Sequence, residues 1–262
     1  MHKDLAENGY KVFKGILDTQ KLNDIKSQIV YLYNKQIQRL NIKAGSFEDN
    51  MIELFRTDIE TYKRTGKTIQ NLPTIYELML SPTIMNILEH RCGIEFPVIT
   101  TKPVCFLHNK NLAVEEIFYK TPPHQDFGSI LSSTNGVVVW FSLCDVPESL
   151  GPLKVKPKSH LDGPQWSRYD NNFAVCDIDE EDLISLPVEL GDMIVFNQML
   201  IHSSGLNTFD NRIRWSINLR YGDAEDQLWQ DNGYVNPYEY KSKPPLNVKL
   251  PTKEDMMQCQ KI

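Results

Sequence analysis

Residues 212–221 read RIRWSINLRY and alternate strictly between polar and apolar side chains. Successive side chains of a β-strand point to opposite faces, so this alternation predicts a strand. One face of this strand is apolar, and the other carries Arg212, Arg214, Ser216, Asn218 and Arg220. A polar face either lies against solvent or lines a wet cavity, and the three arginines on this face favour the cavity.

The segment before this strand contains a histidine next to a second predicted strand. Gly191 and Asp192 predict a turn, and the apolar run MIVF at residues 193–196 predicts the strand that follows it. His202 comes next, in the sequence IHSSG at residues 201–205, and the polar residues 206–211 form a predicted loop. The sequence therefore places His202 shortly before the arginines of the alternating strand.

A second candidate ligand group lies upstream, where residues 121–126 read TPPHQD. The two prolines favour extended backbone. In an extended segment His124 and Asp126 project to the same face, while Gln125 points elsewhere. An isolated H-x-D is a weak signal, because a single His or Asp is more often a hydrogen-bonded structural residue. Together with His202, however, the pair can occupy one face of an octahedral iron(II) ion.

The order of these residues suggests more than generic metal binding. A guanidinium shortly after the second histidine can hold a carboxylate through paired hydrogen bonds. The pattern of H-x-D, a long gap, H and then R therefore suggests oxygenation that depends on iron and 2-oxoglutarate. The sequence contains no nucleophile elbow and no phosphate-cradling glycine loop, so hydrolytic and nucleotide-dependent functions lack support.

The composition is that of an ordinary globular protein. The chain has 262 residues, of which 41% are hydrophobic and 24% charged, and a net charge of −6 that argues against nucleic acid or anionic membrane as a partner. The longest apolar run, at residues 137–141, is too short to cross a bilayer, and the first residues lack the apolar region of a signal peptide. Five cysteines without a C-x-x-C motif fit reduced thiols. We therefore expect a soluble cytoplasmic protein.

The coarse pattern predicts a mainly β fold with flanking helices. Asp18 or Thr19 is a predicted cap for a helix with an apolar stripe, and residues 75–90 predict a second helix. From about residue 96, short apolar runs alternate with Pro, Gly, Asn and Asp clusters, which suits a double-stranded β-helix barrel of the jelly-roll or cupin kind. We expect one domain over residues 1–262, with a helical lead-in at 1–95, a barrel core at 96–222 and a tail at 223–262. The aromatic segment with Trp166, Tyr169 and Phe173 is either packing or a lid over the substrate.

The chain resembles the phytanoyl-CoA dioxygenase (PhyH) family of iron(II)- and 2-oxoglutarate-dependent oxygenases. The resemblance covers nearly the whole chain and is weak between about residues 35 and 100. Two positions depart from the family pattern, since Lys158 and Ser203 stand where the family usually has glycine. The matching segments are NGYKV at 8–12, PHQD at 123–126, VVVWFSL at 137–143, GPL at 151–153 with PKSH at 157–160, GD at 191–192, HSSG at 202–205 and RWS at 214–216.

The resemblance implies a role for each matching site residue. His124, Asp126 and His202 would bind Fe(II), and Arg214 would bind 2-oxoglutarate. Arg214 is preferred to Arg212 because the family's arginine begins a strand that ends in an aromatic residue, and counting back from Tyr221 reaches Arg214. Three further residues fall where the family lines its cosubstrate pocket; these are Gln125, Trp140 and Ser204.

The expected function is that of a non-haem iron dioxygenase. Such an enzyme uses O2 and 2-oxoglutarate to hydroxylate an unactivated C–H bond of a small molecule, with release of succinate and CO2. Related halogenases have a small residue at the carboxylate position, so Asp126 favours hydroxylation, although desaturation and ring closure use the same triad. The substrate, whether a natural-product, sugar-like or acyl intermediate, and the oligomeric state stay open. The alternatives are a non-catalytic cupin-like binding module and a metal-dependent hydrolase or isomerase on the same barrel.

Overall fold

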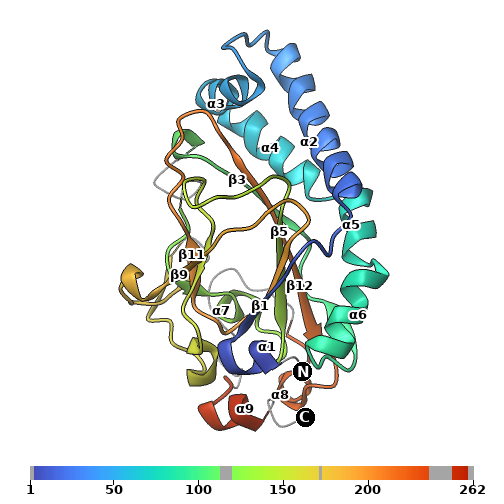
Figure 1. Ribbon diagram of the computed structural model, residues 1–262, viewed down its shortest axis with the longest axis vertical. Coiled ribbons are helices and arrows are strands. Elements are labelled where there is room, and N and C mark those ends of the chain that lie inside the picture. Colours follow the sequence, from blue (N-terminus) through green and yellow to red (C-terminus); the bar gives the residue numbers. More distant parts are fainter. Residues whose placement is uncertain (1–2, 113–119, 171–172, 236–249, 259–262) are drawn as a thin grey trace.

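The computed structural model describes residues 3–112, 120–170, 173–235 and 250–258 of the chain (Figure 1). Within these residues the strands form two six-stranded antiparallel sheets, and helices cover one of them. The helices are α1 Lys3–Asn8, α2 Thr19–Arg39, α3 Phe47–Thr57, α4 Ile59–Ile69, α5 Pro73–Met79, α6 Pro82–Arg91, α7 Phe127–Ile130, α8 Gln227–Asp231 and α9 Lys253–Gln258. The strands are β1 Tyr10–Phe13, β2 Pro97–Ile99, β3 Val104–His108, β4 His124–Gln125, β5 Val137–Ser142, β6 Leu153–Val155, β7 Arg168–Asp170, β8 Phe173–Val175, β9 Ile184–Leu186, β10 Met193–Asn197, β11 His202–Ser204 and β12 Arg214–Asp223.

The first sheet has the order β1-β10-β5-β12-β2, and β3 also pairs with β12. Strand β5 is buried on both faces, as its largely apolar sequence VVVWFS predicts. Val139 and Phe141 join the core beneath the helices, whereas Val138 and Trp140 join a second core between the two sheets. The alternation of β5 therefore separates a helix-facing layer from the interior of the molecule.

Strand β12 follows the same division and confirms the alternating strand seen in the sequence. Its apolar residues Trp215, Ile217, Leu219 and Tyr221 all belong to the helix-facing core. By alternation, the opposite polar face is turned toward the interior between the sheets. The wet-cavity interpretation of this face is thus the one that the structure supports.

The helical layer packs on the outer face of the first sheet (Figure 1). Helix α2 begins after Asp18, whose carboxylate accepts hydrogen bonds from the backbone N–H groups of Gln20 and Lys21. The predicted second helix at residues 75–90 is divided into α5 and α6, because Ser81 and Pro82 interrupt it. Pro82 cannot donate a helical hydrogen bond and starts α6 in its first turn instead.

The second sheet has the order β7-β8-β4-β11-β6-β9 and faces the first across the interior core. Together the two sheets have the jelly-roll character expected from the sequence. No ladder among the described residues closes them into a continuous barrel. In the part of the chain that the structure describes, no helix is long and apolar enough to span a membrane.

The N-terminal segment contributes more than helices. Strand β1 pairs with β10 over Tyr10–Phe13, so the predicted lead-in supplies an edge strand of the first sheet. The departure at Lys158 also has a structural consequence, because this residue adopts φ +68°. Glycine reaches that left-handed conformation without strain, whereas a residue with a Cβ is disfavoured there by about 1 kcal/mol.

Candidate functional site

Three candidate metal ligands meet at the centre of the second sheet. His202 of β11 lies directly opposite His124 of β4 in the antiparallel ladder, and Asp126 follows β4 at the start of α7. One potential ligand atom from each residue lies within 4.8 Å of the other two, and all three residues are buried. The structure therefore brings together the three residues that the sequence singled out, because the pairing of β4 with β11 joins segments far apart in the chain.

Each imidazole is oriented by a backbone carbonyl. Nδ1 of His124 lies 2.7 Å from the carbonyl oxygen of Pro122, and Nδ1 of His202 lies 2.9 Å from that of Leu200. A carbonyl only accepts, so in the neutral rings Nδ1 carries the proton and Nε2 keeps its lone pair. Burial lowers the pKa of His202 to about 3, with a further contribution from His124, so this ring is neutral at neutral pH. Both rings are thus set up to offer Nε2 to a metal.

Asp126 is held by an arginine that the sequence analysis did not name as a site residue. Arg220 of β12 donates from Nε to one carboxylate oxygen at 2.9 Å and from Nη2 to the other at 3.3 Å. Burial by itself would raise the pKa of Asp126, but the Arg220 guanidinium and the neighbouring histidines hold it well below its usual range. The carboxylate is therefore ionised and fixed in orientation. In the sequence, the only sign of this role was that Arg220 is the third arginine on the polar face of the alternating strand.

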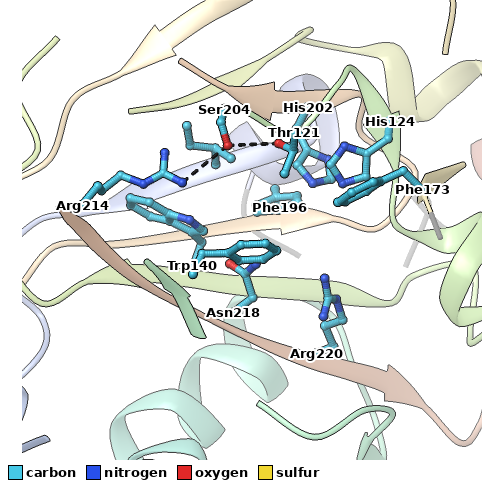
Figure 2. Close-up of a pocket in the computed structure, with 12 residues that line it drawn as sticks. Thr121, His124, Trp140, Phe173, Phe196, His202, Ser204, Arg214, Asn218 and Arg220 are labelled. Atoms are coloured by element: carbon cyan, nitrogen blue, oxygen red, sulfur yellow. Dashed lines mark hydrogen bonds between the residues drawn. The ribbon is translucent and has the colours of Figure 1, made fainter. Parts of the chain in front are cut away.

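A pocket extends from the two histidines along the interior face of β12 (Figure 2). Figure 2 shows Arg214 at one end of this pocket and His124 with Phe173 at the other. The lining residues are Phe106, Thr121, His124, Trp140, Leu153, Phe173, Phe196, His202, Ser204, Arg214, Asn218 and Arg220.

Arg214 is a buried cation at the far end of the pocket. Its guanidinium donates to the carbonyl oxygen of Gly151 and to Ser204 Oγ at 3.4 Å, and it lies 5.9 Å from the centre of the Trp140 ring. Burial lowers its pKa to about 10, so it remains charged at neutral pH. Among the described residues no carboxylate forms an ion pair with it, and its Nε has no hydrogen-bond partner. A buried charge in this state favours an anionic ligand.

Two of the remaining predicted residues line the pocket, and Arg212 does not. Trp140 and Ser204 line the pocket, and Ser204 Oγ also lies 3.0 Å from Thr121 Oγ1. Arg212 is exposed, precedes β12 and lies over the Phe209 ring at 4.5 Å, outside the pocket.

Gln125 does not line the pocket, contrary to the expectation from the family pattern. Its side-chain amide donates to the carbonyl oxygens of Gly163 and Met199, and its Oε1 accepts from the backbone N–H of Gln165. Alternation along β4 turns it away from His124, and these three bonds fix the loops behind the site.

Aromatic side chains form much of the wall, and three of them, Phe106, Phe173 and Phe196, were not assigned to it from the sequence. Phe173 of β8 packs edge-on against His124 with ring centres 4.6 Å apart, and Phe196 lies 4.6 Å from the His202 ring. Of the aromatic segment considered as packing or a lid, Phe173 lines the pocket, while Tyr169 donates to the carbonyl oxygen of Gly128. Strand β8 has only three residues, too few for its periodicity to show in the sequence that Phe173 faces the pocket.

Comparison with known proteins gives a family match over most of the chain. The family model described as phytanoyl-CoA dioxygenase (PhyH) matches residues 5–214. The peroxisomal phytanoyl-CoA dioxygenase of Bos taurus is 22% identical over 244 residues, covering 85% of this chain and 67% of that protein. The protein of the same name from Mus musculus is 23% identical over 245 residues, covering 88% of this chain and 70% of that protein.

Solved structures share the fold. The epimerase SnoN, in complex with Fe3+, alpha ketoglutarate and nogalamycin RO, has a TM-score of 0.57 at 22% identity and covers 84% of this chain and 81% of its own. The carbocyclase SnoK from nogalamycin biosynthesis has a TM-score of 0.57 at 17% identity, with coverages of 95% and 93%. EctD from S. alaskensis, with 2-oxoglutarate and 5-hydroxyectoine, has a TM-score of 0.54 at 15% identity, with coverages of 85% and 75%.

Proposed function

Because the chain belongs to the phytanoyl-CoA dioxygenase (PhyH) family, we propose that it is an iron(II)- and 2-oxoglutarate-dependent dioxygenase that hydroxylates a small molecule. The observation that carries this proposal is the pairing of two features in one pocket. A buried His-Asp-His cluster lies at one end, and the buried, uncompensated Arg214 lies at the other. Neither a simple metal site nor a simple carboxylate site needs both.

The donor set fits iron. His124 and His202 would each offer Nε2, and Asp126 would offer a carboxylate oxygen, which is the two-histidine, one-carboxylate set of non-haem iron(II) oxygenases. The carbonyl oxygens of Pro122 and Leu200 keep the imidazoles in the tautomer that binds metal. Neither Asp126 nor His202 has to lose a proton before binding, because the carboxylate is ionised and the imidazole is neutral.

The other end of the pocket fits a dicarboxylate cosubstrate. Arg214 would bind the distal carboxylate of 2-oxoglutarate, and the hydroxyls of Ser204 and Thr121 would add hydrogen bonds. The rings of Trp140 and Phe196 would cover the methylene groups between the carboxylates and exclude water.

The metal, when bound, would supply oxidative decarboxylation of 2-oxoglutarate to succinate and CO2, coupled to oxidation of a substrate C–H bond by O2. The residues of the chain position the reactants. Arg220 keeps the Asp126 carboxylate fixed, and Phe173 packs edge-on against His124. A continuous core runs from Leu5 to Tyr221, which supports the proposal that the chain acts as a single domain.

The decisive experiment measures succinate formation by the purified protein with Fe(II) and 2-oxoglutarate, with and without O2. We expect succinate only when iron and O2 are both present. Some succinate should form slowly even without substrate, through uncoupled turnover of 2-oxoglutarate. A metal-dependent hydrolase or isomerase would show no dependence on O2, and a binding module would form no succinate. Either result would overturn the proposal. A product mass increased by one oxygen atom would then separate hydroxylation from ring closure or epimerisation.

A further inference from the structure

A second recess lies on the other side of β3 from the metal pocket. It has a volume of about 240 Å3 and is bordered by α2, α4 and β3, whose positions can be followed in Figure 1. Alternation along β3 separates the two sites, since Phe106 lines the metal pocket while Cys105 and Leu107 line the recess. An engineered cavity of about 150 Å3 holds a benzene molecule, so this recess has room for a larger apolar group.

The walls of the recess are largely apolar and contain no anionic group. Tyr33 and Tyr62 line it with ring centres 5.4 Å apart, and Tyr33 Oη donates to the carbonyl oxygen of Tyr62 at 3.3 Å. Burial raises the pKa of both tyrosines and raises that of the Cys105 thiol to about 12. All three groups are therefore neutral at neutral pH.

The charged residues that line the recess are both cations. Lys63 and Lys67 stand one turn apart on α4. Lys63 has a weak contact with the exposed Glu60 at 3.7 Å, and no ion pair involves Lys67 among the described residues. An apolar body would lie against the rings of the two tyrosines, and an anionic group would remain near the lysines.

We propose that this recess binds a monocarboxylate with a compact apolar body, aromatic or aliphatic, at a site separate from the metal pocket. The apolar walls would bury the body of the ligand, and Lys63 and Lys67 would pair with its carboxylate. This site does not depend on the proposed function, because neither lysine lines the metal pocket.

Calorimetric titration of the full chain tests the proposal with 3-phenylpropanoate and octanoate, each compared with its uncharged alcohol. We expect at least one carboxylate to bind about tenfold more tightly than its alcohol. The double variant Lys63→Gln/Lys67→Gln should lose that advantage, whereas the control Lys21→Gln/Lys43→Gln, which removes the same charge from exposed positions, should keep it. Absence of binding by both carboxylates, or equal loss in both double variants, would overturn the proposal.

Two further variants locate the bound probe. Cys105→Met places a longer apolar side chain in the recess and should abolish binding, with retained thermal stability checked in parallel. Arg214→Ala removes the carboxylate anchor proposed for the metal pocket and should leave probe binding unchanged. Loss of probe binding in Arg214→Ala would place the probe in the metal pocket and contradict the second site.

Discussion

Arg212 and Arg214 show how neighbouring residues of one type differ in environment. Arg214 is buried beside Trp140 and Ser204, while Arg212 is exposed over Phe209. Only the first can reach a ligand in the pocket. The difference arises because β12 begins at Arg214, so the interior face starts there.

Arg214→Ala should weaken 2-oxoglutarate binding roughly 30- to 1000-fold, because a charge-assisted, paired contact is worth about 2–4 kcal/mol. Arg214→Lys should recover part of this, since lysine restores the charge without the planar fork. Arg212→Ala is the control and should change the apparent affinity for 2-oxoglutarate little. Steady-state kinetics at varied 2-oxoglutarate concentration ranks the three variants. A larger effect of Arg212→Ala than of Arg214→Ala would contradict the assignment of Arg214 to the 2-oxoglutarate carboxylate.

Arg220→Met should lower metal affinity about 10- to 100-fold, because it removes the group that orients the Asp126 carboxylate. Titration with Mn(II) without cosubstrate measures this independently of turnover. Arg220→Lys should be intermediate, and Arg212→Ala should bind metal normally. Unchanged Mn(II) affinity in Arg220→Met would show that Asp126 is oriented without it.

At the scale of elements, the Gly191–Asp192 turn joins the N-terminal segment to the first sheet. Asp192 accepts from Lys14 Nζ at 2.7 Å and from the backbone N–H groups of Gly15 and Glu189 at 2.9 Å each. Burial would raise its pKa, but these donors lower it below the ordinary value. The carboxylate therefore ties the end of β1 to the start of β10.

Asp192→Asn should destabilise the fold by about 1–3 kcal/mol at neutral pH, through the loss of charge-assisted hydrogen bonds. The folded-state pKa is depressed, so the contribution of Asp192 is complete above the unfolded value of about 4 and is lost as pH falls through the folded value. The difference in the free energy of unfolding between wild type and variant should thus shrink in acid. Urea denaturation measures this difference at neutral pH and at about pH 3, which lies below the pKa of Asp192 in the unfolded chain. An equal difference at the two pH values would contradict the role of the Asp192 carboxylate.

For the whole molecule, ligand binding should be linked to stability. Mn(II) at about 100 times its dissociation constant should stabilise the folded state by about 2.7 kcal/mol, which raises Tm by several degrees in a chain of this size. His124→Ala, Asp126→Ala and His202→Ala should each lose this shift and all succinate formation while remaining folded. Calorimetry with and without Mn(II) checks this, and a full shift in any of the three would remove that residue from the ligand set.

The fold class, the candidate ligand triad and the polar face of β12 could all be predicted from the sequence. These features rest on periodicity and on motif order, which are local properties of a chain. The pocket contains Arg214 and not Arg212, as the family resemblance implied. Three further facts come from the folded structure: Arg220 holds Asp126, Gln125 supports the loops behind the site, and Phe173 packs against His124. Those facts depend on strand pairing between segments far apart in the sequence, and burial and partner distances exist only once such pairs have formed.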